Sequence, residues 1–307
     1  MSDKIFLILA GVLWGTGGLS GALLGELTGL HPLAVAAYRL LIGGGLATVA
    51  VVTRSKALPR SGMAVRRLLA AGGLLAVFQA TYFAAVTLTS VSLATLVSIG
   101  SAPVVVAVVT SIRERQLPQR TTALCIALAV TGLAMLAGMP STRDTWHTLA
   151  GVALALVAGT GFAIFTMISR HRVAGLSTGV TTGLGLLVGG LLLLPVALPL
   201  GMTLPMHTDV LLTAAFLGTV PTAVAYGFYF TGLRHAHPVM AALAAMLEPL
   251  TATVLSVAFF HDSLGPTGIA GAVLLGTALA VNYSAQSRSA DGEPALPGER
   301  PGAGVGS

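Results

Sequence analysis

The chain has 307 residues, of which 8% are Asp, Glu, Lys or Arg and 55% are hydrophobic, with a mean hydropathy of +0.90. A soluble domain covers its surface with roughly 25% charged residues, so a soluble enzyme is all but excluded, and a single cysteine, Cys125, excludes a disulfide scaffold. The net charge of +6 comes from basic residues in short segments between apolar runs, which indicates membrane orientation and no nucleic-acid partner.

Apolar runs long enough to cross a bilayer, about 20 residues each, recur along the whole chain. The first begins behind Lys4 and is too long for the apolar part of a signal peptide, so it is interpreted as an uncleaved helix. The run 68–112 is interpreted as two helices that turn at 87–90, and no alternation typical of a membrane barrel is present. The predicted spans are 5–24, 32–53, 68–87, 91–112, 121–139, 149–169, 177–198, 209–231, 238–259 and 265–285. The fold class is therefore an all-α integral membrane protein with ten transmembrane helices.

The short loops fix a predicted orientation. Placing both termini in the cytoplasm puts fourteen of the sixteen Lys and Arg residues inside, Arg143 outside and Arg39 within a span. A bias of this strength predicts that both termini are cytoplasmic. Residues 287–307, rich in Gly, Pro, Ser and charge, are expected to form a disordered cytoplasmic tail.

The two halves of the chain resemble each other at an offset of about 145 residues, which predicts a repeat over 1–144 and another over 145–286. The matched features are Gly15-Thr16-Gly17 with Gly159-Thr160-Gly161, Tyr82-Phe83 with Tyr229-Phe230, Pro103 with Pro249, and Gln116-Leu117-Pro118 with Ser263-Leu264-Gly265-Pro266. Five spans per half is an odd number, so the second repeat enters the membrane from the opposite side, and the loop charges invert accordingly. Inverted repeats give a transporter two near-equivalent states, with a substrate site between the halves near mid-depth.

Several features occur together in this chain: ten spans in two repeats, Leu-Trp-Gly at 13–15, an arginine in the second span, an aromatic end of the third span, a proline in the fourth and Leu247-Glu248-Pro249 in the ninth. In this combination the chain resembles the EamA-type transporters of the drug/metabolite transporter superfamily. The resemblance covers about 5–285. It implies a carrier in the bacterial inner membrane that exports amino acids, related metabolites or toxic compounds. The second half departs from the pattern at Ala158, which stands where the first half has Trp14.

Two charges within spans are candidate functional groups. Glu248 lies near mid-depth, where a carboxylate costs at least ~2.5–3.5 kcal/mol unless it is paired, protonated or wet. It is predicted either to bind a substrate amine or proton, or to have a structural role, as a partner of Arg39 or as a cap for backbone groups freed by Pro249. Arg39 is predicted either to bind a substrate carboxylate, or to form a fixed ion pair or extend outward to the interface.

The substrate cavity is expected between spans 1, 3, 4, 6, 8 and 9, where the repeated motifs converge. Large polar and ring-bearing side chains there offer stacking and a few hydrogen bonds. An interfacial position remains the alternative for the two tyrosines of span 8. The predicted lining residues are Trp14, Thr16, Gln79, Tyr82, Thr160, Tyr226 and Tyr229, with Arg39 and Glu248.

No cofactor or metal is expected, because the seven histidines fall in loops or at span ends and His235 with His237 form only a two-residue cluster. The predicted function is a secondary transporter of small organic solutes, with the bilayer and a small-molecule substrate as partners; monomer and homodimer are both open. An integral-membrane enzyme acting on lipid, or a passive channel, are the alternatives. An enzyme needs clustered titratable groups, and the spans hold only two.

Overall fold

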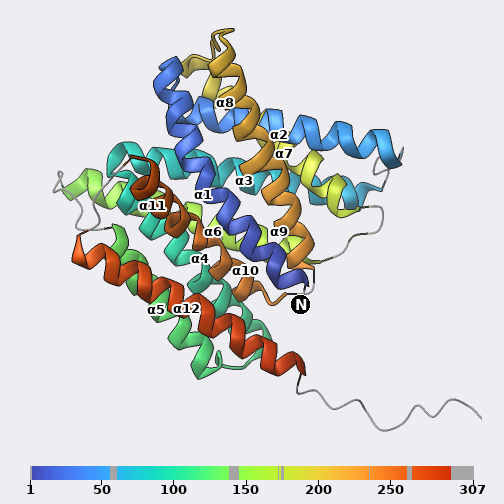
Figure 1. The fold of residues 1–307 in the computed structure, drawn as a ribbon. Helices are drawn as coiled ribbons and strands as arrows, with labels where there is room; N and C mark the ends of the chain where they lie inside the picture. The colour runs from blue at the N-terminus through green and yellow to red at the C-terminus, as the bar shows by residue number, and fades with distance from the viewer. Residues whose placement is uncertain are drawn as a thin grey trace, which may run out of the picture.

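The computed structural model describes residues 2–55, 61–137, 145–171, 173, 176–234, 236–260 and 265–291, and this part of the chain is built of helices and short connections (Figure 1). The elements are α1 (Ser2–Thr28), α2 (Pro32–Ser55), α3 (Gly62–Leu88), α4 (Val91–Glu114), α5 (Arg120–Ala137), α6 (Thr145–Arg170), α7 (Thr178–Ala197), the 3-10 turn η1 (Leu198–Leu200), α8 (Thr208–Gly218), the π-helix η2 (Thr219–Val224), α9 (Ala225–Leu233), α10 (Pro238–Ala245), α11 (Leu247–Phe260) and α12 (Pro266–Asp291).

Ten helices within these ranges are long and apolar enough to cross a membrane, which confirms the ten predicted spans. The eighth consists of α8, η2 and α9, and the ninth of α10 and α11. The long apolar run divides where predicted, because α3 ends at Leu88 and the Ser90 hydroxyl caps α4 by accepting the N–H of Leu93 at 3.2 Å.

The last helix continues to Asp291, so the first five residues of the predicted tail are helical. This segment, Ser287–Asp291, has no proline or glycine to end the helix. Residues 292–307, the remainder of that tail, lie outside the described residues, and so does the predicted outer loop around Arg143.

Helix packing follows the repeat. The first span of each half packs on the third and fourth spans of the other: α1 on α8, α9, α10 and α11, and α6 on α3 and α4. The second spans, α2 and α7, pack on each other, as do the fifth spans, α5 and α12, which lie side by side at one edge of the bundle (Figure 1). Exchanging the two halves therefore reproduces these principal contacts.

Small residues permit these close approaches. A Cβ at Gly15 would lie 2.9 Å from the carbonyl oxygen of Glu248, and one at Gly159 would lie within clash distance of Ser98 in α4. The glycine motifs that reveal the repeat in the sequence are thus the points where α1 meets α11 and α6 meets α4.

Candidate functional site

A cavity of about 530 Å³ lies between the two halves of the bundle. Its inner end is lined by Trp14, Phe162, Tyr226 and Glu248, in the middle of their spans. The rest of its wall reaches the exposed ends of α1, α2, α3 and α4, near the loop 29–31 that joins α1 to α2. The cavity therefore opens at the loop 29–31 end of the bundle, which is the end predicted to face outside.

Aromatic rings form much of the cavity wall. Phe78 stacks on Tyr82 at a centroid distance of 6.1 Å and contacts Phe162 at 5.5 Å. The hydroxyl of Tyr82 shares a hydrogen bond of 2.8 Å with Thr95 Oγ1, which fixes the ring against α4. Rings offer large apolar contact area at low conformational cost, so this wall suits a flat or partly apolar solute.

Arg39 enters the cavity from α2 and is held by η2. Pro221 lacks the N–H that an α-helix would direct to Leu217 O, and the Thr222 hydroxyl donates to that carbonyl instead, at 2.7 Å. Thr222 Oγ1 then accepts a hydrogen bond from Arg39 Nε at 3.3 Å. The π-helix, a feature frequent at functional sites, thereby positions the guanidinium in the cavity wall.

Glu248 lines the same cavity, at the start of α11. Among the described residues its carboxyl group makes no hydrogen bond or ion pair, and Arg39 bonds to Thr222 rather than to Glu248. Both groups line the same cavity. The structure therefore does not contain the fixed Arg39–Glu248 ion pair that was one alternative from the sequence, and it leaves both side chains facing the cavity.

Other polar atoms of the cavity also lack partners. The buried Nε1 of Trp14 has no hydrogen-bond acceptor, and the amide of Gln79, a residue only 5% exposed, has no partner in the described part of the chain. Unsatisfied buried polar groups are uncommon and each costs about 1–3 kcal/mol. A solute in the cavity with matching donors and acceptors would satisfy the Gln79 amide.

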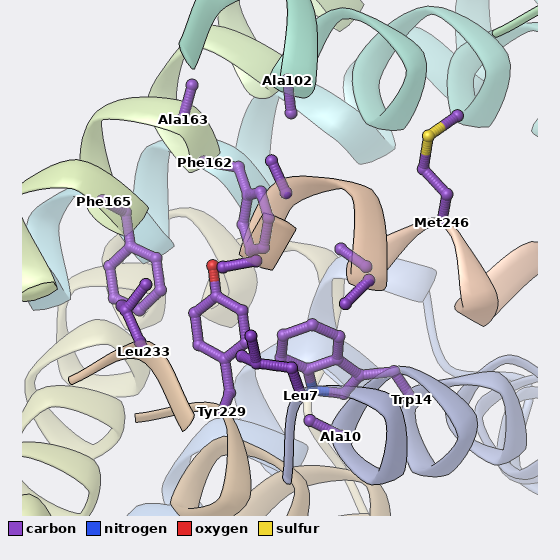
Figure 2. Close-up of a cluster of buried hydrophobic side chains, with 14 of the residues drawn as sticks. Leu7, Ala10, Trp14, Ala102, Phe162, Ala163, Phe165, Tyr229, Leu233 and Met246 are labelled. Atoms are coloured by element: carbon purple, nitrogen blue, oxygen red, sulfur yellow. The ribbon is translucent and has the colours of Figure 1, made fainter. Parts of the chain in front are cut away.

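Tightly packed rings lie at the inner end of the cavity, and Figure 2 shows Trp14, Phe162, Phe165 and Tyr229 within this buried cluster. Tyr229 is fully buried, lies 5.0 Å from Trp14 and 6.0 Å from Phe162 between centroids, and stacks on Phe165. Its hydroxyl shares a 2.5 Å hydrogen bond with Thr166 Oγ1. We call Trp14, Phe162, Phe165, Thr166 and Tyr229 the aromatic plug. It separates the cavity from the end of the bundle where α6 and α9 finish.

The structure brings together six of the nine predicted site residues, which line the cavity: Trp14, Arg39, Gln79, Tyr82, Tyr226 and Glu248. The other three, Thr16, Thr160 and Tyr229, are not part of the lining. Thr16 donates to Leu13 O of its own helix at 2.7 Å, and Tyr229 belongs to the plug. Binding by any of the nine remains a prediction.

Sequence reasoning missed the contribution of the second span and of η2. Pro32, Val35 and Ala36 line the cavity beside Arg39, so α2 forms part of the wall. Arg39 itself was the available signal. A charged side chain within a membrane span usually faces a cavity, so the helix that carries it forms part of the cavity wall. Pro221, in the middle of a predicted span, was the signal for η2.

Within the described residues no group of three or more His, Cys, Asp and Glu side chains could hold a metal ion. His235 lies outside the described residues. His237 caps α10, since its Nδ1 accepts the N–H of Val239 at 3.3 Å. Burial and the positive charge of Arg170 lower the pKa of His237, which favours the neutral ring that this acceptor role requires.

Comparison with known proteins supports a repeated membrane fold. The profile of the EamA-like transporter family matches residues 3–138 and again residues 149–284. A crystal structure of a protein superimposes with a TM-score of 0.79 over 94% of this chain and 98% of that chain, at 19% sequence identity. At this identity the likeness concerns the fold alone.

Curated relatives include an uncharacterized transporter, YwfM of Bacillus subtilis, which is 29% identical over 95% of this chain and 97% of its own length. Protein PecM of Dickeya dadantii is 29% identical over 49% of this chain and 50% of its own length. An uncharacterized transporter of Archaeoglobus fulgidus is 28% identical, over 63% of this chain and 67% of its own length.

Proposed function

Because the chain belongs to the EamA-like transporter family, and is thus a multi-pass membrane transporter of the drug/metabolite transporter superfamily, we propose that it is a secondary transporter which exports small organic solutes across the bacterial inner membrane by alternating access. The proposal takes the cavity as the substrate site and the aromatic plug as the closed gate.

The observation that carries the proposal is a central cavity that is open at one end and closed at the other. It lies between two halves in which the first span of each packs on the third and fourth spans of the other. A cavity of about 530 Å³ ends at Trp14 and Phe162, and the buried Tyr229 lies behind them. A channel needs a continuous path, whereas a carrier needs a site that is open to one side at a time. The swapped packing of α1 and α6 supplies a second state in which the halves exchange roles.

The lining favours a small amphipathic solute, such as an amino-acid-like metabolite. Its volume lies within the roughly 300–1,000 Å³ of sites for small organic ligands. The rings of Phe78 and Tyr82 suit an apolar body, while Arg39 and Glu248 offer one positive and one negative group. A bare ion would need a ring of carbonyls or carboxylates, and this wall has a single carboxylate at mid-depth.

The loop charges support the orientation. Among the described residues, the basic side chains at the end that also carries the closed end of the cavity are Lys4, Arg66, Arg67, Arg113, Arg115, Arg120, Arg170 and Arg234. With that side in the cytoplasm, the structure corresponds to an outward-open state. Export is the direction proposed because the family resemblance implies it, and an exporter releases its solute in this outward-open state.

Solute counterflow in proteoliposomes tests the proposal. A growth-protection and efflux screen with the overexpressed protein first identifies a transported metabolite. We then expect uptake of the labelled metabolite to be accelerated by the unlabelled one inside, and Glu248→Gln to reduce this exchange at equal protein amount. Flux without trans-stimulation would indicate a channel, and conversion of the solute without movement would indicate an enzyme.

A further inference from the structure

A second, smaller cavity lies at the opposite end of the bundle from the mouth of the substrate cavity. It has a volume of about 30 Å³ and lies where α3 and α7 begin and where α6 and α9 end. A single water needs about 10–15 Å³ by this measure, so the cavity holds a compact polar group and not a metabolite. Its lining residues are Arg67, Ser169, Arg170, His171, Val173, Leu176, Thr178, Thr181, Phe230 and Arg234.

Three arginines converge on this cavity from three different helices. Arg67, Arg170 and Arg234 are all half-buried, and in the described part of the chain none of them forms an ion pair with a carboxylate. Within the described residues, these guanidinium groups make one hydrogen bond, from Arg67 Nη2 to His171 O at 3.3 Å. A concentration of half-buried guanidinium donors without a counter-charge is unfavourable unless an anion is bound.

Two further features of the cavity point to the same class of ligand. The Oγ atom of Ser169 is buried and has no hydrogen-bond partner. The first turn of α7, a helix of 20 residues, contributes Thr178 and Thr181 to the wall. Helix N-termini favour negative charge. The cytoplasmic preference of basic residues accounts for arginines on this side, but it does not gather three of them around one buried hydroxyl.

We propose that this cavity, which we call the arginine cavity, binds a phosphate-type oxyanion, either as the headgroup of an anionic phospholipid or as free phosphate. Guanidinium groups bind phosphate oxygens through paired hydrogen bonds. Basic pockets between helices at the cytoplasmic interface bind anionic headgroups. The site is separate from the substrate cavity, and the proposal does not depend on the transported solute.

Thermal unfolding of the full-length protein in a neutral detergent tests the proposal. Cys125 is buried, so its reaction with a fluorogenic thiol reagent reports unfolding. In one arm phosphatidylglycerol is titrated into the micelles, with phosphatidylcholine as the control lipid. In the other arm sodium phosphate is titrated, with chloride at equal ionic strength as the control. Stabilisation by phosphatidylglycerol alone assigns the site to a lipid, and stabilisation by phosphate as well assigns it to the free anion.

Matched variants locate the effect. Arg67→Gln and Arg234→Gln should each weaken the apparent affinity roughly ten- to a hundred-fold, as expected for a lost charged hydrogen bond. Arg66→Gln removes the same charge at the neighbouring, exposed position and should leave the affinity unchanged. If Arg67→Gln does not fold, Arg67→Lys keeps the charge without the paired donors and should still weaken binding. No stabilisation by either ligand, or equal losses in Arg66→Gln and Arg67→Gln, would overturn the proposal.

Discussion

The indole of Trp14 forms part of the aromatic plug and part of the cavity wall. Its ring packs against Tyr226 and Tyr229, with centroids 5.1 and 5.0 Å away, and so forms part of the plug. Its Nε1 is buried without an acceptor, and the residue also lines the cavity. The ring therefore stabilises the closed end, while the N–H has no acceptor in the described part of the chain.

Replacing this indole separates the two roles. Trp14→Phe keeps most of the ring packing and removes the donor, so we expect an unchanged unfolding temperature and a roughly five- to tenfold weaker apparent substrate affinity in counterflow, the effect of one neutral hydrogen bond. Trp146→Phe, at the chain's other tryptophan, which is 78% exposed, is the control and should leave transport unchanged. Equal affinity in both variants would remove Trp14 Nε1 from the site.

The unpaired state of Glu248 leads to a different expectation from that of a structural ion pair. Since Arg39 is already held by Thr222, Glu248→Gln should leave expression and unfolding nearly unchanged and should reduce the transport rate at least tenfold, the usual effect of a lost charged contact. Glu114→Gln, an exposed position at the other end of the bundle, is the control.

The double variant Arg39→Leu with Glu248→Gln distinguishes the two interpretations. If the two residues form a structural pair, Arg39→Leu alone should destabilise the protein and the double variant should recover both folding and transport. If Glu248 contacts the substrate or a proton, the double variant should fold and remain inactive. Transport assays on membranes with equal protein amounts would decide between these outcomes.

At the scale of elements, small residues decide which helices meet. The contact between α5 and α12 depends on Gly132 and Gly271, where an added Cβ at Gly271 would lie 2.6 Å from Gly132 O. Gly271→Ala should therefore destabilise by about 1–3 kcal/mol, as overpacking does. Gly276→Ala, in the same helix but with open space around it, should be neutral or slightly stabilising. Unfolding in mild detergent measures both, and equal stabilities would contradict this packing.

Some features of the helices follow directly from the sequence, and others do not. Hydropathy gives the ten spans, because each must cover the bilayer with apolar side chains. The break of the ninth span at Met246, three residues before Pro249, follows from the missing N–H of that proline. The π-helix at Pro221 does not follow, since it also depends on the Thr222 hydroxyl and on the close approach of Gly43 from another helix.

Side-chain direction within a span is the part that sequence predicts least well. In a soluble helix the polar face identifies the exposed side, but a membrane helix is apolar all round. Tyr226 and Tyr229 lie one turn apart in α9, yet one lines the cavity and the other lies within the plug. Likewise, nothing in the sequence separates Thr16, which bonds to its own helix, from a cavity-facing threonine.

At the scale of the whole molecule the orientation can be measured directly. In a Cys125→Ala background, Met206→Cys lies in the segment after α7 and Leu117→Cys in the segment after α4, and the native residues are 81% and 92% exposed. With cytoplasmic termini, an impermeant maleimide should label the first in intact cells and the second only after lysis. The reverse pattern would invert the topology.

Alternating access predicts that the two ends of the transport path are never open together. Ile99 lines the cavity and is only partly buried, whereas Thr166 is buried within the plug. Cysteine at either position, again without Cys125, is no larger than the native residue. In intact cells a small charged thiosulfonate should modify Ile99→Cys and leave Thr166→Cys unmodified, because the cavity opens only toward the predicted outer side.

In the opposite state the plug is open and the outer end of the cavity is closed. In inside-out vesicles supplied with a transported solute, the exchange of roles between the halves should open the plug, so that Thr166→Cys becomes reactive. In intact cells supplied with the same solute, the reactivity of Ile99→Cys should fall. The two reactivities should change in opposite directions, because a larger inward-open population means a smaller outward-open population. Simultaneous reactivity of both positions from a single side would require a continuous pore. Constant reactivity at both positions would mean that the aromatic plug does not open during transport.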